Sequence, residues 1–292
     1  MHRRRWSTGL VVLAAGLMLA ACSSSKTSGS TTSAPPTNSF GFVPMTPATL
    51  TVDAYVPFPG FWNGTSPSQL TGGLEYKIAQ ALQKDFNLKN LVVRTVNFTA
   101  LTGGLITNYD VAMADIYPTP ARAKVNQYSS CYTTSQTVAV VKKGTPLSTV
   151  AQAKKLNWGI EVGSATGDII LNGVKPDSAP REFEDTAAMM PLLLTGDVNA
   201  VANDLTDIAP YLAKPEYKDF YIPAQFTYAS PETSDQCGAI QLPKTSKNVV
   251  AVDKALKQLI ANGSINRWTS EYLTPTLNGI DPSKIPIISI PG

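Results

Sequence analysis

Charged residues stand at the ends of several apolar segments of this sequence. Asp115 directly follows the strand-like run 110–114, Asp204 follows the run 198–202, and Arg122 comes after a turn. In an open α/β sheet, ligands bind outside the carboxyl ends of the strands. The three residues are therefore candidates for contacts with a charged ligand, although solvation at the surface would explain any one of them taken alone.

A turn bounded by glycines, Gly163 to Gly167, follows another strand-like run and precedes a helical pattern. Backbone N–H groups exposed at such a turn could bind an anion. The turn lacks the lysine and the spacing of a nucleotide-binding loop. Taken alone, such a turn is more often an ordinary strand-to-helix connection, and anion binding is the second interpretation.

Four aromatic residues follow the first strand-like run in a segment interrupted by proline and glycine: Tyr55, Phe58, Phe61 and Trp62. Aromatic faces in such a segment could clamp a ligand. Packing in the core is the alternative, and it is the favoured interpretation of these residues taken alone.

Histidine chemistry is excluded from the expected mature chain. The only histidine, His2, lies in an amino-terminal segment that we expect to be removed. Serine and cysteine triads with histidine, and zinc sites that use histidine, are therefore excluded. We predict no metal, no cofactor and no enzymatic activity.

The amino terminus has the layout of a secretory signal peptide. Arg3, Arg4 and Arg5 precede an apolar run at 10–19, which is too short to cross a bilayer. The next residues, Leu19-Ala20-Ala21-Cys22, resemble the bacterial lipobox, in which the cysteine is lipidated; an ordinary cleavage site is the alternative. We predict a signal peptide at 1–21, lipid on Cys22, and a disordered Ser-, Thr- and Pro-rich tether at 22–48.

Removal of residues 1–21 leaves 21 basic and 21 acidic residues, so the mature chain is formally neutral. A neutral chain lacks the basic surface that nucleic-acid binding requires. We therefore expect no nucleic-acid partner. Cys131 and Cys237 remain as an even pair in an exported chain, where disulfides persist.

The remaining sequence alternates strand-like and helical patterns, which predicts an α/β fold. The predicted strands are 91–96, 110–114, 137–141, 158–162 and 198–202. Apolar residues at helical spacing predict helices at 74–86 and 248–261. A third helix, 186–194, contains Pro191 and is expected to start late or to kink there.

In this order, the segments resemble the extracellular solute-binding proteins that serve ATP-driven (ABC) importers of polar amino acids. The most specific part is Asp110 to Arg122, DVAMADIYPTPAR, which resembles the family's strand, ligand loop and Thr-Pro-x-Arg turn, followed by Tyr128 to Tyr132. Weaker matches lie at 55–58, 73–79, 158–164 and 196–204. The resemblance covers about residues 50 to 273.

The resemblance implies a two-lobed periplasmic-binding-protein-like (type II) fold with a ligand cleft between the lobes. Lobe 1 would comprise 49–137 and 239–273, lobe 2 would comprise 138–238, and 274–292 would be an extension without an assigned function. Two antiparallel hinge strands are expected near 136–142 and 236–242. Cys131 and Cys237 would lie at the entries of these strands and form a disulfide.

The resemblance also implies roles for individual residues. Arg122 would hold the α-carboxylate of the ligand, with backbone N–H groups of Ser164, Ala165 and Thr166, and Asp204 would accept from the α-ammonium. The expected walls of the cleft and its ligand loop are Tyr55, Phe58, Phe98, Asp115 and Tyr117. The family usually has smaller residues at the last two positions, and it has an acid where this chain has Lys77.

Asp115 carries a prediction about the ligand. The charges of Arg122 and Asp204 would already match those of a zwitterion, so a further buried acid requires another cation or hydrogen-bond donor. We therefore expect a ligand that is rich in donors or carries an extra positive charge. The alternative is that Asp115 alone binds the α-ammonium and Asp204 points elsewhere.

The predicted function is capture of a small polar zwitterion, an amino acid or a related amine, for the permease subunits of an ABC importer. The protein would act as a monomer, extracytoplasmic and anchored to the membrane by lipid. Two alternatives are a cyclic-acid dehydratase-like enzyme on the same fold and a ligand-sensing subunit of a membrane receptor. One chain's sequence does not separate import from sensing.

Overall fold

The computed structural model describes residues 38–229 and 236–291. These residues belong to one compact unit that spans 37–292. The expected signal peptide, Cys22 and residues 22–37 of the expected tether lie outside the described residues. Within the described ranges, none of the helices combines the length and the apolar character needed to span a membrane.

The first of two large sheets has five strands in the order β4 (Asn90–Thr95), β1 (Thr49–Ala54), β5 (Val111–Met113), β12 (Ala239–Pro243) and β6 (Asn126–Cys131). β1 runs parallel to β4 and β5, and β12 runs antiparallel to β5 and β6. The helices of this lobe are α1 (Leu74–Asp85), α2 (Phe98–Thr102), α3 (Pro120–Ala123), α9 (Val249–Ala261) and α10 (Ser264–Trp268), and a small ribbon pairs β2 (Asn63–Gly64) with β3 (Leu70–Gly72).

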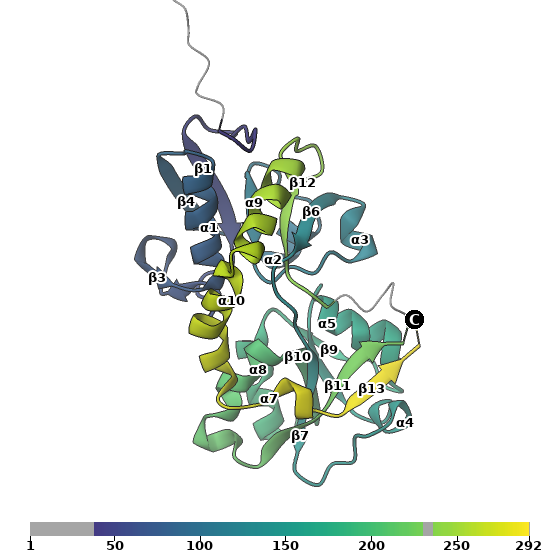
Figure 1. The fold of residues 1–292 in the computed structure, drawn as a ribbon. Helices are drawn as coiled ribbons and strands as arrows, with labels where there is room; N and C mark the ends of the chain where they lie inside the picture. The colour runs from purple at the N-terminus through teal and green to yellow at the C-terminus, as the bar shows by residue number, and fades with distance from the viewer. Residues whose placement is uncertain (1–37, 230–235, 292) are drawn as a thin grey trace, which may run out of the picture. The chain divides into compact units, whose positions relative to one another are not determined.

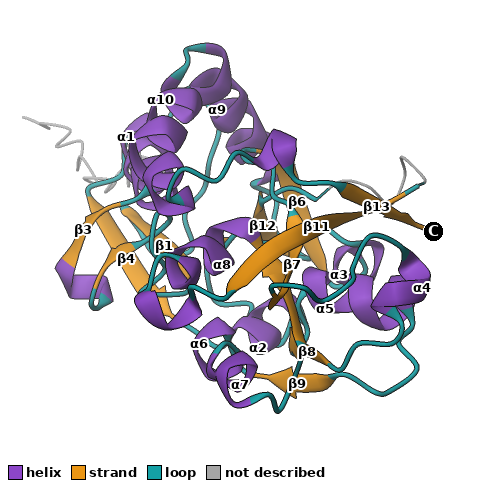
Figure 2. Ribbon diagram, turned by 90° about the horizontal axis from the view of Figure 1, so that it is seen from below, coloured by secondary structure: helices purple, strands orange, loops and turns teal. Residues whose placement is uncertain are grey.

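The apolar faces predicted from helical spacing form the core of this lobe. Ile78 and Leu82 of α1 and Val252 and Leu256 of α9 are fully buried in one cluster with Val52 of β1. Figure 2 shows α1 and α9 beside one another. The helices predicted at 74–86 and 248–261 are thus confirmed to within one residue at each end.

The second sheet has six strands in the order β13 (Ile287–Ile290), β11 (Phe220–Tyr228), β7 (Thr137–Lys142), β10 (Ala200–Asp204), β8 (Trp158–Glu161) and β9 (Arg181–Phe183). Its helices are α4 (Val150–Ala153), α5 (Ala165–Asp168), α6 (Thr186–Met189), α7 (Pro191–Thr195) and α8 (Leu205–Leu212). Alternate residues of β7 enter two cores, Ala139 and Val141 on one face and Val138 and Val140 on the other. Burial on both faces explains why β7 is continuously apolar.

Two predicted boundaries differ in ways that matter for the cleft. β10 begins two residues later than predicted, so that Asp204 is the last residue of the strand and also the N-cap residue of α8. The segment predicted as one helix at 186–194 is divided into α6 and α7, and α7 begins at Pro191. Proline suits the first turn of a helix because its missing N–H would have no partner there.

Two neighbouring crossover segments connect the sheets. Residues 132–136 lead from β6 to β7, and residues 229 and 236–238 are the described parts of the return from β11 to β12. They are joined by hydrogen bonds from Tyr132 N to Gly238 O (2.9 Å) and from Ser135 N to Gln236 O (3.0 Å). β7 lies wholly in the second sheet and β12 wholly in the first, so the crossings precede both strands, whereas the sequence placed them within the strands.

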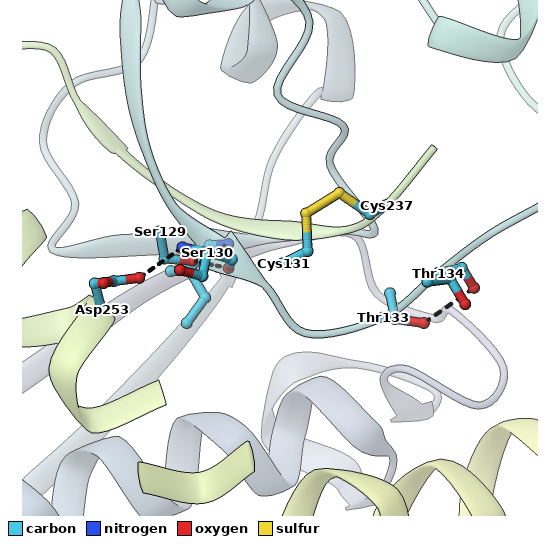
Figure 3. The surroundings of a disulfide bond; sticks show 8 residues. Ser129, Ser130, Cys131, Thr133, Thr134, Cys237 and Asp253 are labelled. Atoms are coloured by element: carbon cyan, nitrogen blue, oxygen red, sulfur yellow. Dashed lines mark hydrogen bonds between the residues drawn. A yellow bond between two sulfur atoms is a disulfide. The ribbon is translucent and has the colours of Figure 1, made fainter. Parts of the chain in front are cut away.

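The predicted disulfide between Cys131 and Cys237 is present, with the two Cα atoms 5.8 Å apart. Figure 3 shows it beside the loop that carries Thr133 and Thr134. Cys131 ends β6, and Cys237 directly precedes Gly238 in the other crossover. The bond therefore ties the two crossovers together at the edge of the first lobe.

The carboxyl-terminal segment makes a third connection between the lobes. Leu273 is buried in the core of the first lobe, and Ile285, Ile288 and Ile290 are buried in the cores of the second. β13 pairs in parallel with β11 at the edge of the second sheet. In Figure 1 this segment runs in yellow from α10 past α8 to β13. The residues that the sequence left as an extension thus complete the second sheet.

Candidate functional site

A cavity of about 410 Å³ lies where residues of both sheets and their loops meet. Every predicted ligand-contact residue lines it. They are Tyr55, Phe58, Phe98, Asp115, Tyr117, Arg122, Ser164, Ala165, Thr166 and Asp204. A cavity of this volume accommodates a small molecule such as a single amino acid.

Local helix geometry places Arg122 in the cavity. Thr119 caps α3 by accepting a hydrogen bond from Arg122 N (3.3 Å), and Pro120 occupies the first turn. The guanidinium donates from Nη1 to Tyr117 O (3.0 Å) and from Nη2 to Gly163 O (2.9 Å) of the second lobe. Its Cζ lies 5.2 Å from the centre of the Phe98 ring. Two of the N–H groups of this fork are engaged, so others can donate to a ligand.

Asp204 and Tyr117 meet across the lobes. The Tyr117 hydroxyl, in the loop after β5, donates to Asp204 Oδ1 at the end of β10. Both side chains are buried. Burial raises the pKa of Asp204 well above its ordinary value, and the nearby charge of Asp115 raises it further. An added cation in this position would be stabilised by the carboxylate.

Asp115 adopts a left-handed backbone conformation, with φ of 46°. Its Oδ2 accepts from the Ser135 hydroxyl (2.8 Å), while the buried Oδ1 has no hydrogen-bond partner in the described part of the chain. Burial raises the pKa of Asp115 to about 6, and the Ser135 hydroxyl opposes the rise. The carboxyl group thus lies between the cavity and the first crossover.

The predicted anion-binding turn has its hydroxyl groups engaged within the second lobe. Ser164 Oγ donates to Glu161 O and accepts from Gly167 N, both at 2.8 Å, so that it caps α5. Thr166 Oγ1 donates to Asn203 Oδ1 (3.0 Å). The N–H groups of Ala165 and Thr166 make no hydrogen bond within the described ranges. Backbone groups, not side chains, are therefore free to bind a ligand at this turn.

The aromatic residues after the first strand divide between cavity and core. Tyr55 and Phe58 line the cavity, and their rings pack edge to face with centroids 6.2 Å apart. Phe61 and Trp62 are fully buried in the first lobe's core, and Phe61 stacks on Phe58 at 4.5 Å. Each of the two interpretations left open by the sequence thus describes one pair.

Three acids line the cavity that the sequence did not single out as ligand contacts, namely Glu161, Asp185 and Asp207. Glu161 ends β8 and accepts from Asn203 Nδ2 (3.0 Å). Asp185 caps α6 and also accepts from the Tyr55 hydroxyl (3.4 Å). The sequence signals for them were the strand end at Glu161 and the three-residue spacing from Asp204 to Asp207, which places both on one side of α8.

Burial makes two of these acids, Glu161 and Asp207, hard to ionise. It raises the pKa of Glu161 to about 7, where Asn203 opposes the shift and Asp185 adds to it. It also raises the pKa of Asp207 well above its ordinary value, with Asp204 and Glu161 as the next causes. Tyr55, beside Asp185, has its pKa raised to about 12, by burial first. A positive charge bound among these groups would relieve their mutual repulsion.

The cavity therefore holds five carboxyl groups and one guanidinium. The acids are Asp115, Glu161, Asp185, Asp204 and Asp207. Within the described residues, none of the five forms a salt bridge, and Lys77 does not line the cavity. In the same part of the chain, no three histidine, cysteine or acidic side chains are grouped as metal ligands would be. A bound cation would favour the ionised form of these carboxyl groups, so the excess of acids over basic groups fits an organic cation or a molecule with several donors.

Solved structures with the same fold include several amino-acid-binding proteins. A substrate-binding protein of an amino-acid ABC transporter has a TM-score of 0.65 at 21% identity, over 77% of this chain and 99% of that chain. A substrate-binding protein of an amino-acid ABC transporter from Streptococcus pneumoniae, bound to L-arginine, has a TM-score of 0.65 at 19% identity, over 79% and 96%. An ancestral amino-acid-binding protein, described as a precursor of cyclohexadienyl dehydratase, has a TM-score of 0.65 at 18% identity, over 77% and 95%.

At these identities the likeness establishes the fold, which is the two-lobed α/β fold of type II periplasmic binding proteins predicted from the sequence. Comparison with curated proteins finds no match. The pattern of the bacterial extracellular solute-binding proteins, family 3, matches residues 50–275, which is most of the chain. The chain therefore belongs to the bacterial extracellular solute-binding proteins of family 3.

Proposed function

We propose that this protein captures an amino acid with a positively charged side chain and presents it to the permease subunits of an ABC importer. The observation that carries the proposal is the lining of the cavity, in which five acids that a bound cation would help to ionise face one arginine. A zwitterion brings no net charge, whereas a cationic amino acid brings one net positive charge. The L-arginine bound to the Streptococcus pneumoniae relative, which has the same fold, supports this ligand class.

The backbone of the amino acid would bind between Arg122 and Asp204. The remaining N–H groups of Arg122 and the backbone N–H groups of Ala165 and Thr166 would donate to the α-carboxylate. Asp204, with the Tyr117 hydroxyl beside it, would accept from the α-ammonium. Because both ligand charges are then paired, uncharged analogues should bind weakly.

The side chain would extend toward the acids of the second lobe. Asp185 and Asp207 line the same cavity as the rings of Tyr55 and Phe58. Acids combined with aromatic faces suit a guanidinium or ammonium group, which gains both charge pairing and cation–π contact. Asp115 would add to the negative field from the side of the crossover.

Calorimetric titration with arginine, lysine, glutamine and glutamate tests this proposal. We expect arginine or lysine to bind most tightly, and we expect Asp207→Asn to weaken their binding about tenfold or more while changing glutamine binding little. Asp115→Ser should reduce the ratio between the affinities for arginine and for glutamate. Tight glutamate binding by the wild type, or the same ranking in both variants, would contradict the proposed ligand class.

The lipid anchor and the location are part of the proposal. Cys22 lies outside the described residues, and the support is the lipobox-like sequence Leu19 to Cys22. Cys22→Ser should release the protein from the membrane fraction, and unchanged retention would refute the anchor. Sedimentation of the purified protein with and without ligand tests whether it acts as a monomer.

A second candidate is an enzyme that dehydrates a cyclic acid. It is favoured by the likeness to the ancestral precursor of a dehydratase and by the raised pKa of Glu161, which would suit a general acid. Against it, an acidic substrate would add negative charge to a cavity already rich in acids. Turnover of a cyclic hydroxy acid by the purified protein, lost in Glu161→Gln, would favour the enzyme.

A further inference from the structure

A buried glutamate lies beneath the ligand loop, outside the cavity. Glu75, in the first turn of α1, has no exposed surface. It accepts hydrogen bonds from Asp115 N (2.7 Å), the Tyr132 hydroxyl and Trp62 Nε1. Within the described residues it has no basic partner. Three donors from three separate segments therefore converge on one buried carboxyl group.

Its two oxygens have different partners. Oε1 accepts two hydrogen bonds, one from the backbone N–H of Asp115 in the ligand loop and one from the Tyr132 hydroxyl in the first crossover. Oε2 receives Trp62 Nε1, which also donates to Met113 O (3.1 Å). One oxygen atom thus joins the loop that lines the cavity to the segment that connects the lobes.

Asp115 itself contacts both crossovers. Its Oδ2 accepts from Ser135 in the first crossover (2.8 Å), and its Oδ1 packs against Gly238 in the second. A Cβ atom at position 238 would lie 2.3 Å from Oδ1, so only glycine leaves room for the carboxyl group. Tyr132 N donates to Gly238 O (2.9 Å), so the two crossovers that Asp115 contacts are also hydrogen-bonded to each other.

We propose that Glu75 is a positioning residue for ligand binding, which couples the ligand loop to the crossovers between the lobes. Asp115 has a left-handed backbone, a conformation that persists only where its surroundings fix it. Glu75 fixes the Asp115 amide while Ser135 and Gly238 fix the carboxyl group. A shift of Tyr132 therefore moves the acceptor of the Asp115 amide.

This inference rests on the proposed function only in its effect on affinity. If the cleft binds an amino acid, a ligand loop held in place lowers the ordering cost of binding. Loss of the Glu75 contacts should then weaken binding although Glu75 does not touch the ligand. The coupling itself concerns the protein without ligand and is measurable there.

Amide hydrogen exchange of the full-length protein without ligand provides the direct test. Tyr132→Phe removes the hydroxyl group that the first crossover donates to Glu75. The hydrogen bond from the Asp115 backbone N–H to Glu75 can still form in this variant. Tyr109→Phe is the matched control, because Tyr109 is a fully buried tyrosine of the same lobe that packs in one cluster with Ala114, while its hydroxyl accepts from Gln241 (2.8 Å). We expect exchange at Asp115 to rise about tenfold in Tyr132→Phe and to stay within about twofold in Tyr109→Phe.

Variants of Glu75 distinguish positioning from simple packing. Glu75→Met places a side chain of similar size without an acceptor oxygen, so amide exchange at Asp115 should rise most in this variant. Glu75→Gln keeps one acceptor oxygen and should retain most of the protection of the Asp115 amide. Affinity for the amino acid that binds best should fall in the same order, by about tenfold for Tyr132→Phe.

Equal exchange at Asp115 in Tyr132→Phe and Tyr109→Phe would overturn the coupling, whatever happens to stability or to Glu75→Met. If no amino acid binds the wild type, the proposed ligand class fails, and the exchange comparison still decides the coupling. If amino acids bind and exchange changes as expected but affinity does not, Glu75 is not a positioning residue for binding.

Discussion

The carboxyl-terminal strand offers a sharp test of the structure, because two isoleucines of one strand differ in burial. Ile290 has no exposed surface and Ile287 is 62% exposed. A Cβ atom added to Gly173 would lie 2.2 Å from Ile290 Cδ1, so Ile290 packs directly against the backbone there. Truncation of a fully buried isoleucine to alanine costs about 2–5 kcal/mol, because a cavity remains where the surroundings cannot collapse.

We therefore expect Ile290→Ala to lower the free energy of unfolding by about 3–4 kcal/mol, Ile290→Val by about 1 kcal/mol, and Ile287→Ala by less than about 0.5 kcal/mol. Urea unfolding at equilibrium measures all three, and an unchanged m-value would show that the change is in stability alone. Equal effects of Ile290→Ala and Ile287→Ala would refute the placement of this strand in the core of the second lobe.

Three further predictions follow from buried polar groups and from the disulfide. Burial is the main cause that raises the pKa values of Glu75, Asp115 and Glu161, to about 8, 6 and 7 respectively. The folded state therefore binds protons on these groups more tightly than the unfolded state does. The free energy of unfolding without ligand should accordingly fall as the pH rises from about 5 to 8. A melting temperature that rises over this range would contradict this. Replacement of Cys131 and Cys237 by serine opens a loop with a sequence separation of 106. It should lower the free energy of unfolding by up to about 4.7 kcal/mol. An unchanged midpoint of urea unfolding would contradict this stabilising role of the disulfide. Asp110→Ala removes the side chain that accepts hydrogen bonds from Met45 N (2.7 Å) and Thr51 N (2.8 Å). It should lower the free energy of unfolding by about 2–4 kcal/mol. Thermal unfolding measures the change, with Asp197→Ala at an exposed position as the control.

The layered fold was predictable because its signals are local. The spacing of Ile78 and Leu82, or of Val252 and Leu256, marks a buried helix face in the sequence itself. The return of the tail to the second lobe was not predictable in this way. β13 has four residues, and its place depends on pairing with β11, more than fifty residues earlier in the chain. No pattern within so short a segment specifies such a partner.

The candidate site was predictable where a strand end marks it. Asp115 follows β5, Asp204 is the last residue of β10, and both line the cavity as expected. Asp185 and Asp207 were not found, because each resembles an ordinary surface acid in the first turn or at the cap of a short helix. Both are only partly buried, and their place in the cavity lining depends on residues far apart in the sequence.

From the sequence, Asp115 is the residue that predicts a cationic ligand, whereas in the structure three acids of the second lobe also line the cavity. The carboxyl group of Asp115 is held by Ser135 and packs against Gly238, so part of its role concerns the crossovers. The excess of acids in the cavity comes from Glu161, Asp185 and Asp207, all on the second lobe. Ligand charge would then be selected mainly by the second lobe, while the first lobe contributes the arginine, the aromatic walls and the link to the hinge. Substitution of Asp207 and substitution of Glu75 should accordingly affect different quantities, the ranking of ligands in one case and the affinity for all of them in the other.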